Sequence, residues 1–106
     1  MKNLSLLFAA FLLLQIPTLS QTNWTKYANN PVLTFGSQGS WDEGGSEFGS
    51  VLFDGNIYHM WYSGNDGVNF RIGHATSPDG IIWMKDTLNN PVVDLGPPGS
   101  WDDFWV

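Results

Sequence analysis

Three carboxylates, Asp42, Glu43 and Glu47, stand just before an apolar segment, and Trp41 directly precedes the first of them. Paired carboxylates can supply the acid, base or nucleophile that a hydrolytic reaction needs. An indole beside them can stack on a flat apolar surface such as the face of a sugar ring. Asp42 and Glu47 are therefore the candidate catalytic residues, and Trp41 is a candidate substrate-binding residue.

Three further residues are candidates for substrate binding. His59 and Trp61 are two positions apart, so a β-strand would place both on one face. They would either line a sugar pocket or pack against a neighbouring sheet. Arg71, the one arginine in the sequence, would either pair with a carboxylate and shift its pKa or lie on the surface. His74 is expected to be an ordinary strand residue.

Other kinds of chemistry have no signal in the sequence. The chain has no cysteine, no Gly-x-Ser-x-Gly motif, no phosphate-binding loop and no histidine pair at metal-binding spacing. The loop at residues 65–69 carries oxygen ligands but lacks the length and the closing glutamate of a calcium loop. We therefore expect neither a metal ion nor another cofactor.

The candidate acids belong to an internal repeat. The string Gly36-Ser37-Gln38-Gly39-Ser40-Trp41-Asp42 returns sixty positions later as Gly96-Pro97-Pro98-Gly99-Ser100-Trp101-Asp102. Upstream, Asn30-Pro31 returns as Asn90-Pro91, and Trp24-Thr25-Lys26 returns as Trp83-Met84-Lys85. Such a period is typical of chains built from repeated structural units.

The repeat bears on which acid could be catalytic. Asp42 is matched by Asp102 and Glu43 by Asp103, and a catalytic acid is not needed once per structural unit. A structural role for Asp42, such as capping a turn, is therefore an open alternative. Glu47 has no clear equivalent in the second copy; its alternative is an ordinary exposed glutamate at the start of a strand.

Composition places limits on the class of protein. The chain has 106 residues and a formal charge of -6. The acidic balance argues against nucleic-acid binding, which requires clustered Lys and Arg. Residues 1–20 resemble a signal peptide, with Lys2 before an apolar run that is too short to span a membrane, followed by small residues near Ser20. A buried N-terminal helix is the alternative. The chain is thus expected to be secreted, periplasmic or at the cell surface, without a membrane span after cleavage.

The rest of the chain is expected to be all-β. Strands are predicted at residues 32–35, 48–53, 57–63 and 70–76, and another begins at 81–83. A two-residue turn is expected at Asp54-Gly55, and a further turn at residues 77–80. Large side chains alternate onto both faces of residues 57–63, so both faces are expected to be covered. Four antiparallel strands in about sixty residues are typical of one β-propeller blade.

These segments resemble a known family. The strings Ser50-Val51-Leu52-Phe53-Asp54-Gly55-Asn56-Ile57-Tyr58-His59-Met60-Trp61-Tyr62-Ser63-Gly64 and Ile72-Gly73-His74-Ala75-Thr76-Ser77-Pro78-Asp79-Gly80-Ile81-Ile82-Trp83 resemble the first blade of five-bladed β-propeller glycosidases. These are the arabinanase, levansucrase and invertase types, of the glycoside hydrolase family 43 and 32 kind. The resemblance implies a partial propeller at residues 21–106, with a first blade at about 46–95 and a second that begins at about 96–106.

The resemblance also implies a mechanism. Members of the family place an acid near the innermost strand of the first blade, a second carboxylate on the next blade and an acidic proton donor on the third. Asp42 or Glu47 would be the first of these acids; the Asp-Pro that marks this acid in many relatives is not in the sequence. The chain is thus expected to be the N-terminal piece of a propeller, inactive alone, with carbohydrate and the remaining blades as its partners.

Two other interpretations remain open at this stage. One is a non-catalytic propeller that binds glycans or acts as a scaffold, which the repeated Trp-Asp pair fits equally well. The other is a free-standing small β domain, for which residues 21–106 would unfold cooperatively when expressed alone.

Overall fold

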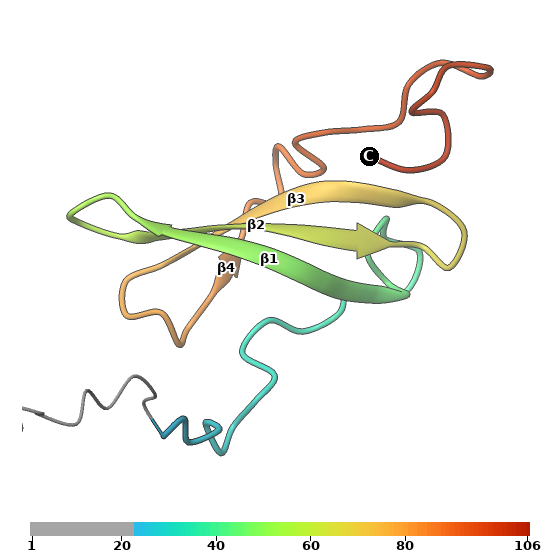
Figure 1. Cartoon of the computed structure of the whole chain (residues 1–106). Coiled ribbons are helices and arrows are strands. Elements are labelled where there is room, and N and C mark those ends of the chain that lie inside the picture. Colours follow the sequence, from blue (N-terminus) through green and yellow to red (C-terminus); the bar gives the residue numbers. More distant parts are fainter. Residues whose placement is uncertain (1–22) are drawn as a thin grey trace, which may run out of the picture.

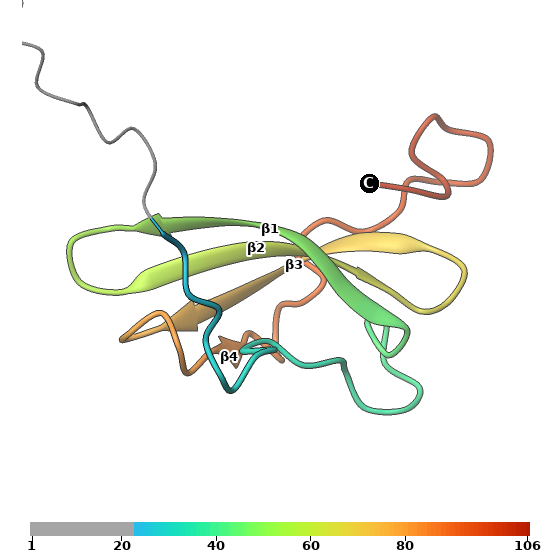
Figure 2. The ribbon, with the colours of Figure 1, turned by 60° about the horizontal axis from the view of Figure 1, so that its bottom comes forward.

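The computed structural model describes residues 23–106, which form one four-stranded antiparallel sheet (Figure 1). The strands are β1 (Gly45–Phe53), β2 (Tyr58–Asn65), β3 (Phe70–Ser77) and β4 (Met84–Lys85), in the order β1-β2-β3-β4. The sheet is strongly curled, and the short β4 lies beneath its edge (Figure 2). The described residues contain no helix, which confirms the all-β prediction. The predicted signal peptide at residues 1–20 lies outside the described residues.

Each of the three turns between strands is organised by one aspartate. The Asp54 carboxylate accepts hydrogen bonds from the amides of Asn56 and Ile57. Asp66 does the same for the amides of Val68 and Asn69, and Asp79 for those of Ile81 and Ile82. This is the behaviour that makes aspartate a favoured turn residue. The β1–β2 turn spans residues 54–57, because Phe53 pairs with Tyr58, so the predicted two-residue turn is too short.

One predicted strand, at residues 32–35, is wrong, and the predicted fourth strand begins three residues later than expected, at Met84. Residues 32–35 are irregular, and residues 81–83 form a bend before β4. At 81–83 the Asp79 carboxylate takes the amides of Ile81 and Ile82, which are then not free to pair with a neighbouring strand. The other three strands are where the sequence predicts them, with β1 starting earlier, at Gly45.

The sheet has two faces with different surroundings, because alternate residues of a strand point to opposite sides. Gly49, Tyr62 and Gly73 are paired across β1, β2 and β3, and we call their side the Tyr62 face. Ser50, Trp61 and His74 are paired in the same way on the other side, the Trp61 face. Tyr62 is 2% exposed and Trp61 is 40% exposed. Within the described chain, the expected cover is therefore present on one face of β2 only.

A loop at residues 36–43, loop 1, covers the Tyr62 face. Its Trp41 stacks on Tyr62 with ring centroids 5.8 Å apart. The indole also lies over Gly64 and Gly73, where an added Cβ would approach it to 2.5 and 2.7 Å. These two strand glycines therefore make room for Trp41. We call Tyr62, Gly64, Gly73 and Lys85 the Trp41 docking site.

The structure reproduces the sequence repeat. In loop 1 the Gly36 amide donates to the Asp42 carbonyl at 3.0 Å, and in loop 2 (residues 96–103) the Gly96 amide donates to the Asp102 carbonyl at 2.9 Å. The amides of Gly39 and Gly99, both with positive φ, donate to the carboxylates of Glu43 and Asp103. Glycine is required at these positions of positive φ. The shared Gly-x-x-Gly-Ser-Trp-Asp spacing thus encodes one loop structure, used twice.

We predict that Gly73→Ala destabilises the protein by about 1 to 3 kcal/mol, because the new methyl group overlaps Trp41 and Tyr62. The change would appear as a lower urea midpoint, followed by tryptophan fluorescence. Gly49→Ala is the matched control, since Gly49 also pairs with Tyr62 but an added Cβ would meet nothing closer than the Met60 side chain, at 3.4 Å. Equal midpoints for both variants would contradict the assigned role of Gly73.

Candidate functional site

A concave region is present on each face of the described sheet. On the Tyr62 face, a pocket of about 460 Å³ opens beside Asp42, Lys85 and Asn90. On the Trp61 face, a cavity of about 360 Å³ is lined by Glu47, Ser63, Phe70, Trp105 and Val106. The two predicted catalytic acids therefore lie on different faces.

Asp42 is the centre of a hydrogen-bond network on the Tyr62 face. The residue is 3% exposed, and its carboxylate accepts from Ser40 Oγ at 2.9 Å, from the Tyr62 hydroxyl at 3.2 Å and from Lys85 Nζ at 2.5 Å. The Lys85 ammonium also lies 5.3 Å from the centroid of the Tyr62 ring. The carboxylate thereby joins loop 1 to β2 and β4.

Electrostatics keep this carboxylate ionised. Burial alone would raise its pKa, but the hydrogen bonds from Lys85 and Ser40 outweigh that effect and hold the pKa of Asp42 below its ordinary value of 3.8. Burial and the Asp42 charge together raise the pKa of Tyr62. Asp42 is therefore a fixed anion already engaged by three donors.

Asn90 continues the network to β3. Its amide oxygen accepts from the His74 amide at 2.7 Å, and its amide nitrogen donates to the His74 carbonyl at 2.9 Å and to the Tyr62 hydroxyl at 3.4 Å. The repeated Asn-Pro therefore attaches the chain after β4 to the edge of β3.

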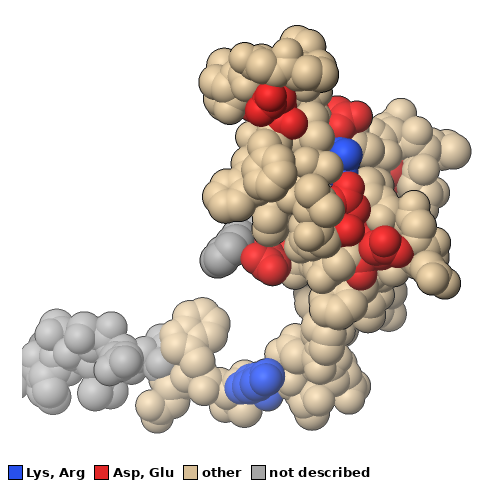
Figure 3. All heavy atoms as spheres, turned by 90° about the vertical axis from the view of Figure 1, so that its right-hand side faces the viewer, with Lys and Arg blue, Asp and Glu red and all other residues tan. Residues whose placement is uncertain are grey.

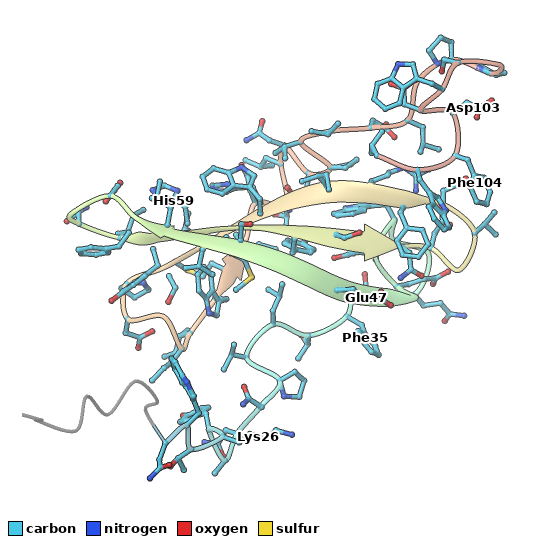
Figure 4. All side chains as sticks on the ribbon, in the orientation of Figure 1. Lys26, Phe35, Glu47, His59, Asp103 and Phe104 are labelled. Carbon is cyan, nitrogen blue, oxygen red and sulfur yellow. The ribbon has the colours of Figure 1, made fainter. Side chains whose placement is uncertain are left out.

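Glu47 has different surroundings. It pairs with Ser63 across β1 and β2 and lines the cavity on the Trp61 face together with Phe70 and Trp105. The two rings meet edge to face, with centroids 5.3 Å apart. Figure 4 shows Glu47 on β1 at the end of the sheet remote from His59. Within residues 23–106, Glu47 forms no salt bridge.

His59 and Trp61 lie on the Trp61 face, as predicted, together with His74. The His59 ring stacks on Trp61 at 5.9 Å and on His74 at 5.4 Å. His59 Nδ1 lies 3.1 Å from His74 Nε2, and His59 Nε2 lies 3.0 Å from the Asp54 carboxylate. Hydrogen bonds from the Ile57 amide and from His59 lower the pKa of Asp54 to about 2. His74 is thus part of a ring cluster.

Arg71 is engaged by two carboxylates. Its guanidinium contacts Asp66 and Asp94, each at 2.8 Å. The contact lowers the pKa of Asp66, and the pKa of Asp94 is lowered by the Leu95 amide together with Arg71. Seen from this end of the sheet, acidic side chains surround a single basic group on the body of the sheet (Figure 3). Arg71 therefore ties the β2–β3 turn to the segment before loop 2.

Sequence reasoning missed the residues that hold Asp42, above all Lys85, Tyr62 and Asn90. The repeat contained a signal for two of them, since Lys85 and Asn90 recur at the positions of Lys26 and Asn30. Within residues 23–106, no group of three or more His, Asp or Glu side chains could hold a metal ion. The same part of the chain has no helix long and apolar enough to cross a membrane.

Comparison with known proteins identifies no relative: no family model, no curated protein and no solved structure matches the chain.

We predict that Asp42→Asn destabilises the protein by about 2 to 4 kcal/mol, because Lys85 is left as a half-buried charge without its anion. The pKa of Asp42 is lowered by folding, so the wild-type carboxylate stabilises the fold above about pH 4, and this stabilisation is lost as the pH falls through the folded pKa. Urea unfolding at pH 7 and below pH 4 measures both effects. The variant should lose less stability on acidification than the wild type.

Asp102→Asn is the matched control for this experiment. Asp102 has the same position in loop 2, but its loop is not docked on the sheet. We expect its unfolding midpoint at pH 7 to stay close to that of the wild type. Similar losses for both variants would show that the carboxylate acts within the loop rather than through Lys85.

Proposed function

We propose that this chain belongs to an exported, carbohydrate-active β-propeller that resembles the five-bladed glycosidases, with β1–β4 as one blade. The supporting observation is the position of Glu47, an exposed acid, in a cavity that Phe70 and Trp105 also line. A carboxylate beside aromatic rings can accept hydrogen bonds from hydroxyl groups while the rings cover an apolar face of a sugar.

The rest of the Trp61 face extends this surface. Along β2, His59 lies four residues from Ser63, which corresponds to about 13 Å. The exposed indole of Trp61 lies between them, beside His74. A chain of several sugar units could therefore contact Glu47 at one end and the ring cluster at the other.

Hydrolysis requires a second carboxylate. An oxocarbenium-like transition state needs one acid to protonate the leaving oxygen and another to act as base or nucleophile. Asp42 does not supply it, because it lies on the Tyr62 face and is bound to Lys85. In the proposed enzyme Glu47 is the acid from this blade, and a neighbouring blade supplies the other.

A glycan-binding protein without catalytic activity is the alternative. The observation in its favour is that Glu47 is the one carboxylate among the residues lining the described cavity. Such a protein would use the aromatic rings and Glu47 for binding alone.

We predict that the chain binds a soluble arabinan or fructan and that Trp61→Ala weakens this binding at least about tenfold, which corresponds to about 1.4 kcal/mol. Affinity electrophoresis with each polysaccharide in the gel measures the effect. Trp101→Ala is the matched control, because that indole is 91% exposed but does not line the cavity that contains Glu47.

Glu47→Gln separates the two functions. We expect it to weaken binding, and we expect the chain alone to release no reducing sugar. Release of sugar that Glu47→Gln abolishes would show that the site is already catalytic in this chain. Binding that neither Trp61→Ala nor Glu47→Gln affects would place the carbohydrate site elsewhere and contradict the proposal.

A further inference from the structure

Loops 1 and 2 have the same backbone structure but different surroundings; the Ser40 hydroxyl donates to the Asp42 carboxylate, whereas the Ser100 hydroxyl donates to the Pro97 carbonyl. Both close through the same amide-to-carbonyl bond, and in both the Ser amide donates to the carbonyl three residues earlier, at 2.9 Å in loop 1 and 3.0 Å in loop 2. Loop 1 is docked, with Trp41 on Tyr62 and Asp42 bound to Lys85. In loop 2, Trp101 is 91% exposed.

The docked loop shows which groups recognise it. An indole fits over two strand glycines because neither has a Cβ, and it stacks on the tyrosine between them. The aspartate that follows accepts from the tyrosine hydroxyl and from a lysine on the edge strand. Loop 2 presents the same indole and carboxylate in the same order.

We propose that loop 2 is a docking element for a second antiparallel sheet that carries its own copy of the Trp41 docking site. That sheet would have a Tyr-x-Gly sequence on a central strand, a glycine opposite the tyrosine on the next strand, and a lysine on its edge strand. Trp101 would lie over the glycines, and Asp102 would pair with the lysine.

A second copy of this chain is not the partner, because its docking site is already filled by Trp41. Loop 1 leads directly into β1 and therefore acts at the high effective concentration of an intramolecular group, in the millimolar range for short connections. Loop 2 of another molecule cannot compete at micromolar concentration. The partner is a different sheet of the same construction.

The docking of loop 2 can be tested independently of carbohydrate binding, since it involves neither Glu47 nor the Trp61 face. The first test converts loop 1 into the sequence of loop 2. Only Ser37→Pro, Gln38→Pro and Glu43→Asp are needed. The backbone donors of the loop 1 hydrogen bonds are the amides of Gly36, Gly39, Ser40 and Glu43, all of which are kept. Glu43→Asp shortens the carboxylate that accepts from Gly39 and leaves loop 1 with the acid that loop 2 has.

We expect this triple variant to keep the near-ultraviolet circular dichroism signal of the wild-type Trp41–Tyr62 stack. Its melting temperature should lie within about 4 °C of the wild-type value. In a domain of this size, such a shift corresponds to less than about 1 kcal/mol. Trp41→Ala is the comparison and should lose both the signal and stability. Glu43→Asp alone separates the effect of the carboxylate from that of the prolines. A triple variant that resembles Trp41→Ala, while Glu43→Asp alone is stable, would overturn the proposal.

The second test uses the docking site that Trp41→Ala empties. Sedimentation of the Trp41→Ala/Trp101→Ala double variant, which cannot dock on itself, mixed with wild-type chain should show a complex. This complex should be lost when Trp101→Ala replaces the wild-type chain. The wild-type chain alone should stay monomeric. Absence of any Trp101-dependent complex would overturn the proposal. A wild-type dimer that Trp101→Ala dissociates would also overturn it, because the partner of loop 2 would then be a second copy of the chain.

Discussion

The buried carboxylate of Asp42 is the constraint on which the rest of the structure depends. It accepts from Lys85, which is 43 residues away in the sequence, and from Tyr62 in the middle of the sheet. Placing a charge in a site that is 3% exposed costs free energy, and only several donors acting together offset that cost. Since those donors lie on loop 1, β2 and β4, the carboxylate is satisfied only when the loop is docked and the last strand is paired.

The same network shows that the sequence repeat and the sheet do not share boundaries. The segment at residues 83–90 belongs to β1–β4, through Lys85 and Asn90. Loop 2 follows in the same repeat and faces away from that sheet. In the first copy the situation is reversed: Trp24 is 92% exposed, whereas its equivalent, Trp83, is half-buried and donates to the Gly80 carbonyl. In each copy of the repeat, therefore, the segment with the Trp and Asn-Pro residues and the Gly-x-x-Gly-Ser-Trp-Asp loop do not both pack on β1–β4: the second copy contributes the former and the first copy the latter.

Local chemistry explains which parts of the fold could be predicted from the sequence. The strands around Tyr62 and Gly73 have β-favouring side chains and lie between turns that contain aspartate. Both features involve only neighbouring residues, so the sequence alone predicts these strands. Residues 32–35 also contain apolar side chains, but they have no partner strand in the described chain, and pairing is not encoded locally. The site was less predictable, because the separation of Asp42 from Glu47 depends on how loop 1 crosses the sheet edge. A bulge between Glu47 and Gly49 shifts the register there, and nothing in the sequence indicates it.

This separation bears directly on the chemistry that the chain could perform. Two carboxylates that act on one glycosidic bond are about 5 to 10 Å apart and face the same space. Asp42 contacts Tyr62 and Glu47 pairs with Ser63, so consecutive residues of β2 direct them to opposite sides of the sheet. Asp42, which recurs as Asp102 and is bound to Lys85, has a structural role. Glu47, which is exposed and open to a cavity lined by Phe70 and Trp105, is available for substrate. For this chain, the carbohydrate proposal therefore depends on Glu47, and its second carboxylate has to come from a surface that faces the Trp61 side.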